Sequence, residues 1–383
     1  MSPVDAAIGL PPSMPLSVIL PNFNHGALIP RALRALLGQT PSAKEIIVVD
    51  DGSTDDSVKI IEGFQRRFQS VHLIRNATNR GIIASVKTAL EVATGEYLLF
   101  ASSDDFVLPG LFSHALAGLS ENPRAAFFCA SVALLGADNR VIGVRPFTEP
   151  RRGRGYLSPT DVRRAIRETD FWVIGTSTVY RRVPLAEVGY FDVRLGSIGD
   201  VLTNRLLAFR YGFYFDPAVL AAYNKDPMSF SGRNALSVTE SRHLLDAARS
   251  WIAENLPEDV RDEHGRLFDR RMRFGLARLG VIWRSGKLET NATADILNFG
   301  SVDRNILAFL ARVPAISGLL MLGWMTLRMR PFSIWGLVEG WRRALHFKWF
   351  CRAAIEREVN KVNSQTGAAA DFAHDHGSSG KIG

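Results

Sequence analysis

Short apolar runs alternate with amphipathic segments along the first hundred residues. The apolar runs have the length of strands and cover residues 16–21, 45–50, 71–74 and 95–101. The segments between them carry apolar residues at helical spacing and cover residues 27–38, 55–68 and 81–93. Residues 46–49 are four apolar residues in a row, which is typical of a strand covered on both faces. Because strand and helix alternate, the pattern predicts an α/β fold with a mostly parallel sheet and flanking crossover helices.

The pattern becomes less regular after Pro109. It predicts a strand over 126–135, a loop over 146–160, a helix over 160–168 and a buried strand over 171–180. From about residue 235 the chain is helical and aromatic, and from residue 363 its composition predicts a disordered tail. The predicted parts are a loose leader (1–14), an α/β domain (15–230, with halves 15–110 and 111–230), a helical region (235–362) and the tail (363–383).

Composition and charge narrow the kinds of partner. With 46% hydrophobic and 22% charged residues, the chain is typical of globular proteins. Its net charge of +8 favours anionic partners, such as nucleotide phosphates and membrane phospholipids. The basic residues form only short clusters, so we expect no nucleic acid partner. Two cysteines and the lack of a signal-peptide pattern indicate a cytoplasmic protein without a disulfide framework or a cysteine zinc site.

Two pairs of aspartates follow predicted strands. Asp50 and Asp51 end one apolar run, and Asp104 and Asp105 come shortly after another. In a parallel sheet the carboxyl ends of the strands meet at one edge, where open α/β sheets bind ligands. Each pair alone is explained most simply as a helix N-cap, but two pairs in successive units favour a shared ligand. A divalent cation between these carboxylates and a diphosphate would neutralise a nucleotide leaving group.

Several motifs in this half of the chain occur together in a characteristic order. They are residues 17–24 (SVILPNFN), 32–40, 48–55 (VVDDGSTD), 79–81 (NRG) and 93–97 (ATGEY). Together they resemble the nucleotide-binding half of family 2 glycosyltransferases of the GT-A fold, and the resemblance covers about residues 15–230. It implies a Rossmann-like α/β domain that is followed here by the helical C-terminal region. It also implies an inverting transfer of a sugar from a nucleotide-diphosphate sugar, with UDP favoured, and a Mg²⁺ or Mn²⁺ cofactor.

The resemblance assigns the donor site to five positions. Pro21 and Phe23 would line the pocket for the base through backbone and ring contacts. Asp51 would accept a hydrogen bond from the base imide, which needs an acceptor held in place. Asn79 and Gly81 would shape the wall of the nucleotide site, where glycine permits close approach of the backbone.

The segment 100–105 matches the Asp-x-Asp metal motif of the family with one departure. Its first acid is Ser102 here, so Asp104 keeps the position of the metal ligand and Asp105 supports it. One carboxylate together with phosphates is a common arrangement for Mg²⁺. Ser103, in the same turn, is assigned to the donor site. The alternative is that Asp104 only caps a turn or helix.

An inverting transfer needs a general base near the acceptor hydroxyl. Similar enzymes carry an acid about 95 positions after the metal motif and before an apolar helix, and Asp200 matches that position here. Asp200 could instead be the N-cap of that helix, and Asp192 is the less favoured competitor for the base. Related enzymes often place a metal-binding histidine further on. Asp226 stands there in this chain, and a replacement ligand and a coincidence are equally consistent with it.

The C-terminal third combines aromatic and basic residues. Its tryptophans at 324, 335, 341 and 349 lie among Arg328, Arg330, Arg342, Arg343 and Lys348. This mixture suits a helix in a membrane interface on anionic lipid, and equally a helical cap packed on the catalytic domain. The apolar stretch 313–327 is shorter than the roughly 20 residues of a spanning helix.

These observations lead to one functional prediction and one rival. The prediction is an inverting glycosyltransferase, cytoplasmic or peripheral on the cytoplasmic membrane face, with a saccharide or lipid-linked saccharide acceptor. A role in bacterial surface polysaccharide or lipopolysaccharide assembly is expected from the resemblance alone. The rival is a catalytically inactive nucleotide-sugar-binding or membrane-scaffold protein, which Ser102 and the missing histidine favour.

Overall fold

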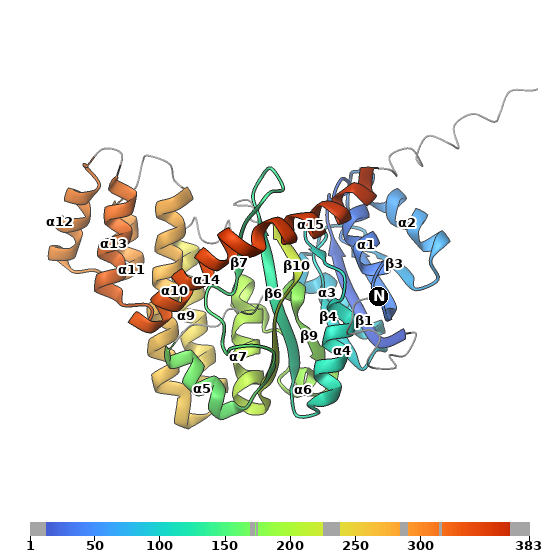
Figure 1. Ribbon diagram of the computed structural model, residues 1–383, viewed down its shortest axis with the longest axis horizontal. Coiled ribbons are helices and arrows are strands. Elements are labelled where there is room, and N and C mark those ends of the chain that lie inside the picture. Colours follow the sequence, from blue (N-terminus) through green and yellow to red (C-terminus); the bar gives the residue numbers. More distant parts are fainter. Residues whose placement is uncertain are drawn as a thin grey trace, which may run out of the picture.

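A ten-stranded sheet with helices on both faces forms one end of the molecule, and a bundle of helices forms the other (Figure 1). The computed structural model describes residues 13–168, 173, 175–224, 238–283, 290–313 and 316–367. The strands are β1 (Ser13–Asn22), β2 (Ser42–Asp50), β3 (Val71–Arg75), β4 (Tyr97–Phe100), β5 (Phe106–Val107), β6 (Phe127–Leu135), β7 (Val141–Arg145), β8 (Gly155–Leu157), β9 (Val179–Arg181) and β10 (Phe213–Asn224). The helices of the sheet domain are α1 (Ile29–Leu37), α2 (Ser57–Arg67), α3 (Ile82–Val92), α4 (Leu111–Glu121), α5 (Pro159–Glu168), η1 (Gly175–Ser177), α6 (Arg182–Glu187), η2 (Val193–Ile198) and α7 (Gly199–Tyr211).

The strands follow the order β3-β2-β1-β4-β9-β6-β10-β5, with β7 and β8 attached to β6 and β10. The first four strands in this order are parallel, as the alternating pattern predicted. β9 then lies between β4 and β6 and is antiparallel to both. The predicted α/β class with flanking helices is confirmed, but the sheet as a whole is mixed rather than mostly parallel. The reversal comes from β9, which follows β6 after a long excursion through α5.

Apolar runs without alternation mark the strands that are buried on both faces. In β1, Val18 and Leu20 pack into one core cluster and Ile19 into the other. In β2, Ile46 and Val48 share the first of these cores, while the neighbouring Ile47 and Val49 belong to the second. Successive strand residues point to opposite faces, so a continuous apolar run requires a cover on each side. Helices α1, α2 and α4 supply the first cover, and α3, α5 and α7 supply the second.

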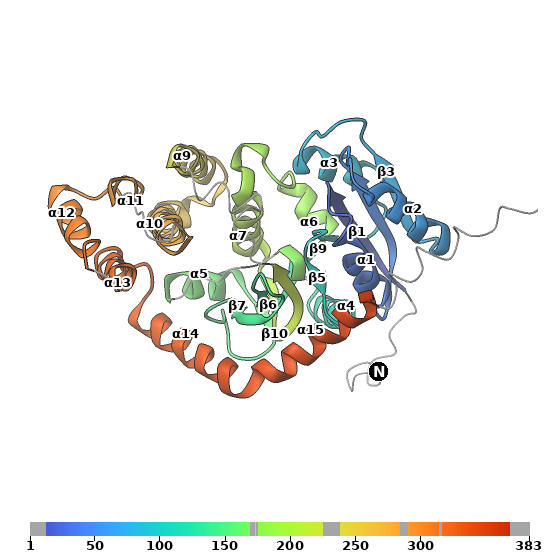
Figure 2. The same cartoon turned by 90° about the horizontal axis from the view of Figure 1, so that it is seen from above.

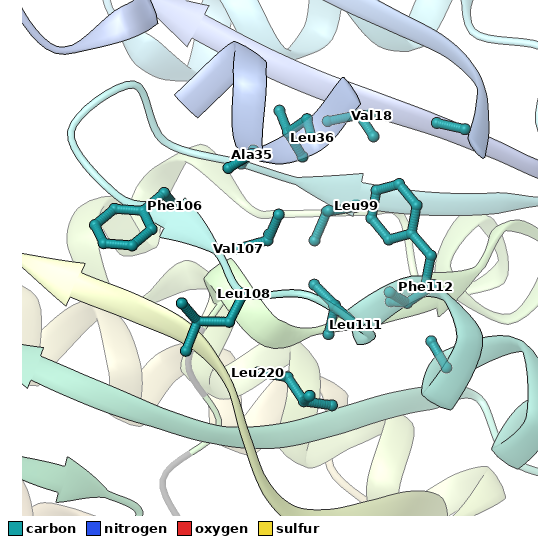
Figure 3. Close-up of a cluster of buried hydrophobic side chains, with 14 of the residues drawn as sticks. Val18, Ala35, Leu36, Leu99, Phe106, Val107, Leu108, Leu111, Phe112 and Leu220 are labelled. Atoms are coloured by element: carbon teal, nitrogen blue, oxygen red, sulfur yellow. The ribbon is translucent and has the colours of Figure 1, made fainter. Parts of the chain in front are cut away.

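A dense part of the first core lies beneath the turn that carries the second acidic pair. Figure 3 shows Phe106, Val107 and Leu108 packed among side chains of β1, α1, β4 and α4. Phe112 on α4 is fully buried there, and burial of one such side chain stabilises the fold by roughly 1.5–3 kcal/mol. The loop after β4 that carries Asp104 and Asp105, which we call the acidic turn, therefore rests on tightly packed side chains.

Two local predictions for the middle of the chain are wrong. Within the predicted strand over 171–180, Gly175–Ser177 form the short 3-10 helix η1, and among the described residues the strand β9 begins at Val179. The hydroxyl groups of Thr176 and Ser177 bind the Asp105 carboxylate and the Ala130 carbonyl, and these contacts hold the chain in a turn. The predicted loop over 146–160 contains the short strand β8, which pairs with β10.

The C-terminal helices form a bundle and then return across the sheet domain. They are α9 (Val238–Asn255), α10 (Glu258–Trp283), α11 (Thr290–Leu297), α12 (Ser301–Leu310), α13 (Ser317–Met329), α14 (Ile334–His346), the π-helical segment η3 (Phe347–Cys351) and α15 (Arg352–Gly367). The segments α14, η3 and α15 form one continuous helical rod, which crosses the front of the sheet domain in Figure 1 and, in Figure 2, bends along the outer edge of the molecule and ends beside α1. None of the described helices is long and apolar enough to cross a bilayer.

The predicted start of the C-terminal tail is wrong by five residues. Residues 363–367 continue α15 instead of starting a disordered tail. Asn363 lies 3.3 Å from the guanidinium of the buried Arg31 on α1, so tertiary contact extends the helix beyond what composition suggests. The rest of the predicted tail, and the predicted leader except for its last two residues, lie outside the described part of the chain.

Candidate active site

The loops after β1 and β2 are joined by hydrogen bonds at the carboxyl edge of the sheet. The buried carboxylate of Asp50 accepts from the Asn22 amide at 2.9 Å and from the Ser53 backbone N–H at 2.9 Å. Asn24 in turn accepts from the Thr54 backbone N–H at 2.8 Å. Every described side-chain hydrogen bond of Asp50 is within these loops, so this carboxylate anchors the turn.

Asp51 holds a third loop against the first two. Its Oδ1 accepts from the Asn76 amide at 2.7 Å and from the Arg80 N–H at 2.9 Å, and its Oδ2 accepts from the Gly81 N–H at 2.7 Å. Burial alone would raise the pKa of Asp51, but the hydrogen bonds from Arg80, Asn76 and Gly81 outweigh it and lower this pKa. The carboxylate is therefore ionised and fixed in orientation.

Gly52 allows these loops to approach closely. Its φ is +76°, and a Cβ there would lie 2.8 Å from the Thr78 carbonyl carbon and 2.9 Å from the Asn79 nitrogen. No other residue combines this backbone conformation with so little space. The glycine in the motif is thus required by the contact between two loops.

The other predicted donor-site residues surround this anchored region. Pro21 is half-buried, and the ring of Phe23 is exposed just beyond it. Asn79 is exposed, and its side-chain oxygen accepts from the Gly81 N–H at 3.0 Å. A Cβ at Gly81 would meet nothing within 4 Å, so the space in front of this residue is open. The described backbone brings all of these residues to the same edge of the sheet.

The turn after β4 carries the predicted metal motif. The Ser102 hydroxyl donates to the carboxylate of Asp104, so the serine at the position of the first acid contacts the second. Ser103 is buried, with its hydroxyl 2.5 Å from Nδ1 of His25. The backbone carbonyl of Asp104 accepts from Arg31 at 2.9 Å and from the Asn224 amide at 2.7 Å. These contacts fix the backbone of the turn and leave the half-buried Asp104 carboxylate at its surface.

Asp105 differs from Asp104 in its surroundings. It is buried, and its two oxygens accept from the Thr176 hydroxyl at 2.6 Å and from the Asn224 backbone N–H at 2.8 Å. Burial, with the nearby charge of Asp104 adding to it, raises the pKa of Asp105 to about 8. Protein donors thus engage this carboxylate, which leaves Asp104 as the more available of the pair.

Asp200 lies close to the same turn. It is the second residue of α7, where its Oδ1 accepts from the Val201 N–H at 2.8 Å. A Cβ on Gly175 would lie 3.9 Å from the other carboxylate oxygen of Asp200. Because Gly175 adjoins Thr176, which binds Asp105, the short helix η1 connects Asp200 to the acidic turn. Burial raises the pKa of Asp200 to about 6.

The described residues offer a hard divalent cation one suitable ligand, the Asp104 carboxylate. Within the described ranges, no three histidine, cysteine or acidic side chains are grouped closely enough to hold a metal ion by themselves. Asp104 supplies one carboxylate oxygen donor of the kind that Mg²⁺ and Mn²⁺ prefer. The donor set fits a cation that also binds the phosphates of a substrate. Asp226, the other predicted ligand, lies outside the described residues.

Comparison with known proteins agrees with this geometry. Residues 17–189 match the family model described as glycosyl transferase family 2. This part of the chain is a family 2 glycosyltransferase domain. An uncharacterised glycosyltransferase of Escherichia coli K12 is 39% identical over 97 residues, which are 25% of this chain and 28% of that protein. A poly(ribitol-phosphate) β-glucosyltransferase of Bacillus spizizenii is 36% identical over 97 residues, covering 24% of this chain and 15% of that protein. The chain thus matches well under two thirds of the length of these relatives.

Solved structures show the same fold as this chain. Residues 1–349 of Staphylococcus aureus TarS, solved with UDP-GlcNAc, superpose with a TM-score of 0.56 at 19% identity, covering 83% of this chain and 93% of that one. A mannosyltransferase from Pyrobaculum calidifontis, solved with GDP-Man and Mn²⁺, gives a TM-score of 0.50 at 17% identity and covers 87% of each chain. The predicted GT-A fold with additional C-terminal helices is confirmed.

Sequence reasoning missed several polar residues of this family 2 site. They are His25, Arg31 and Asn224, which contact the acidic turn from the loop after β1, from α1 and from β10. His25 directly follows the quoted motif 17–24 and Arg31 directly precedes the quoted motif 32–40, so proximity in sequence was an available signal. Asn224 stands at the end of a strand without a motif. Its role depends on long-range contacts that no local pattern encodes.

Proposed function

We propose that this protein is an inverting glycosyltransferase that moves a sugar from a nucleotide-diphosphate sugar to an acceptor hydroxyl. The observation that carries the proposal is that the short helix η1 lies between Asp200 and the acidic turn. It places the Asp200 carboxylate beside Gly175, one residue from the Thr176 hydroxyl that binds Asp105 at 2.6 Å. A leaving-group site and a candidate base therefore share one small region, as an in-line displacement requires.

The nucleobase of the donor would bind at the loops after β1, β2 and β3 that Asp50 and Asp51 hold together. Asp51 has two acceptor oxygens, and its described contacts leave lone-pair capacity on Oδ2. An imide N–H of uracil is a suitable donor for this site, which supports UDP as the nucleotide. Phe23 offers an exposed ring beside Pro21, and Asn79 and Gly81 border the open space in front of them. Ser103 lies further along the same edge.

The diphosphate would meet Asp104. Bound Mg²⁺ or Mn²⁺ would neutralise the charge that develops on the leaving diphosphate. Asp104 would hold such a cation through its half-buried carboxylate, and the Ser102 hydroxyl orients that carboxylate. Asp105 would support the turn from beneath through Thr176 and Asn224. Asp226 remains a predicted ligand. TarS with UDP-GlcNAc and the mannosyltransferase with GDP-Man and Mn²⁺ are consistent with both substrate class and cation.

Asp200 would remove the proton from the acceptor hydroxyl. A general base works best when its pKa lies near the working pH, and burial moves the pKa of Asp200 to about 6. The bond from the acceptor oxygen to the anomeric carbon would form as the bond to the diphosphate breaks. The proton would pass to Asp200, and the configuration at the anomeric carbon would invert.

A relative that acts on poly(ribitol-phosphate) supports a role in bacterial surface polysaccharide or lipopolysaccharide assembly. A saccharide or lipid-linked saccharide, reached in the cytoplasm or at the cytoplasmic membrane face, is the acceptor class that we propose.

Purified protein and a panel of UDP- and GDP-sugars with Mn²⁺ test the proposal. We expect one donor to raise the melting temperature and to be hydrolysed slowly without an acceptor, and EDTA to abolish hydrolysis. Donor binding without any hydrolysis or transfer would support the rival, an inactive nucleotide-sugar-binding or scaffold protein. If no nucleotide sugar binds, both ideas fail.

A further inference from the structure

The first part of the rod, α14 and η3, carries its large apolar side chains on the outside. Ile334 is 78% exposed, Trp335 80%, Trp341 66% and Trp349 71%. We call this surface the aromatic face, and its residues are Ile334, Trp335, Val338, Trp341, Leu345, Trp349 and Phe350. Figure 2 shows that this rod runs along the outer edge of the molecule, so no described element covers it. Single exposed apolar residues are ordinary, but a continuous row of this size marks a binding surface.

The opposite side of the rod provides its packing against the protein. Gly336 and Gly340 are buried there, and a Cβ on Gly340 would come within 1.9 Å of the Phe147 ring. Arg343 donates to the Ser131 hydroxyl at 2.8 Å and lies 3.4 Å from Glu149. Small residues and one paired cation therefore attach the helix. The usual amphipathic arrangement is inverted, because the tryptophans contribute little to the core of the protein itself.

Cations accompany the aromatic face. Residues 330–352 include five arginines and lysines and a single acid, Glu339, and one of these cations, Arg343, lies on the packing side of the helix. Arg342 and Arg352 are exposed and pair with Glu339 and Glu356, while the ammonium of Lys348 lies 5.6 Å from the centre of the Trp349 ring. This surface thus presents tryptophans and positive charge together.

An open apolar groove of about 740 Å³ extends this surface onto α13. Its lining includes Leu319 and Leu327 from α13 and Ile334 and Leu337 from α14, with Arg330 at the turn between them. Leu319 is 72% exposed, so the apolar surface continues from one helix to the next.

We propose that the aromatic face docks on a bilayer that contains anionic phospholipid, with α14 and η3 lying parallel to the membrane plane. Tryptophan prefers the boundary between head groups and acyl chains, and a helix with one apolar face and flanking cations lies in that boundary. Each cation near an anionic surface adds to this attraction. A second copy of the chain is less suitable, because a two-fold contact through this face would bring the same cations together.

Docking would hold the family 2 domain at the membrane. That consequence rests on the proposed function, since it would bring a lipid-linked acceptor within reach, whereas binding to lipid does not depend on catalysis. The two ideas can therefore fail separately.

Vesicle flotation of the full chain tests the docking. We expect binding to vesicles of phosphatidylcholine mixed with anionic phosphatidylglycerol, and weaker binding to phosphatidylcholine alone, because anionic lipid attracts cations near the membrane surface. The triple variant W335Q/W341Q/W349Q should lose at least about tenfold in partitioning. The matched control V183Q/V302Q/F309Q replaces three other apolar residues of similar exposure and should bind as the unchanged chain does.

Three results would overturn the proposal. They are no binding of the unchanged chain to anionic vesicles, equal binding of the triple variant, and loss of a solution dimer in the triple variant without any change in lipid binding. Circular dichroism and the thermal shift with donor nucleotide, measured on both triple variants, show that each is folded. A chain that binds vesicles but hydrolyses no donor would contradict the proposed function and leave the docking intact.

Discussion

Neighbouring aspartates in one motif have different tasks. Asp50 binds Asn22 and Ser53 within the loops, while Asp51 fixes the residues 76–81 and lies next to the open space at Gly81. Both are buried carboxylates with the same sequence context. Asp50 ends β2 and Asp51 directly follows it, and successive side chains of an extended chain point to opposite faces.

Asp51→Asn tests the assignment of the base pocket. The amide nitrogen would face a backbone N–H at Arg80 or Gly81, so one donor would lose its acceptor. We expect the free energy of unfolding to fall by about 1–3 kcal/mol and the affinity for UDP to fall by about tenfold or more. Urea unfolding and calorimetric titration with UDP measure the two effects. The exposed Asp138→Asn is the control, and unchanged UDP affinity in Asp51→Asn would remove this residue from the pocket.

Asp200→Asn tests the assignment of the general base. Removal of a general base costs about 10²–10⁴ in rate, so we expect kcat to fall in that range while donor binding is retained. Asp192→Asn is the matched control, since Asp192 pairs with Arg194 at the surface. A large loss in Asp192→Asn together with normal turnover in Asp200→Asn would exchange the two roles.

The pH dependence of the reaction gives a separate test of Asp200. Its carboxylate is protonated below a pKa of about 6 and ionised above it, so kcat/KM should rise with pH through about 6 and then level off. Tyr180 on β9 interacts electrostatically with Asp200, and burial raises the pKa of Tyr180, so this phenol stays neutral over that range. Initial rates between pH 4.5 and about 9 would show the rise, and an acid limb near the ordinary pKa of aspartate would argue against Asp200.

At the scale of elements, the acidic turn is shaped by three structures from distant parts of the chain. Arg31 from α1, Thr176 from η1 and Asn224 from β10 each bind Asp104 or Asp105. The Arg31 guanidinium also lies 4.5 Å from the centre of the Phe106 ring. The metal motif is therefore positioned by tertiary contacts and depends on more than its own loop.

Arg31→Met tests this support. The Asp104 carbonyl would lose one donor, and the turn should loosen. We expect a loss of about 1–3 kcal/mol in unfolding free energy and a several-fold higher Mn²⁺ concentration for half-maximal turnover. Arg34→Met, on the same helix but over the Phe64 ring, is the control for removing a partly buried arginine. Equal Mn²⁺ dependence in both variants would mean that Arg31 serves stability alone.

At the scale of the whole molecule, one long rod joins the helical bundle to the nucleotide-binding half. It begins at α14 next to the bundle, and its last helix, α15, reaches α1 (Figure 2). Asn363 on α15 lies beside Arg31 on α1, so two segments 332 positions apart in the sequence are brought into contact.

The attachment of this rod can be tested with a pair of helical glycines. Gly340→Ala places a methyl group against the Phe147 ring, whereas Gly275→Ala on α10 meets nothing within 4 Å. Both changes gain similar helix propensity, about 0.8–1 kcal/mol, so their difference reports the contact. We expect Gly340→Ala to be less stable than Gly275→Ala by about 1 kcal/mol or more in urea unfolding. Equal stabilities would show that the Phe147 ring moves aside freely.

Local pattern was sufficient for the first half of the fold. Apolar runs predicted β1, β2 and β3, and helical spacing predicted α1, α2 and α3, because these elements follow one another and pack on their neighbours. It failed at Gly175–Ser177, where the hydroxyl groups of Thr176 and Ser177 bind Asp105 and Ala130. An apolar run cannot reveal such partners.

The order of motifs along the chain was enough to specify the family 2 domain, its acidic turn and the strand ends that carry it, since each depends on residues close in sequence. Which carboxylate is anchored and which is available came from folding alone. Asp105 is engaged because η1 and β10 reach it, and Asp200 lies near the turn because η1 connects them. The outward tryptophans of α14 are equally a result of packing, since buried glycines take the inner face. Contacts between distant segments have no local signal, and here they assign the role of each residue.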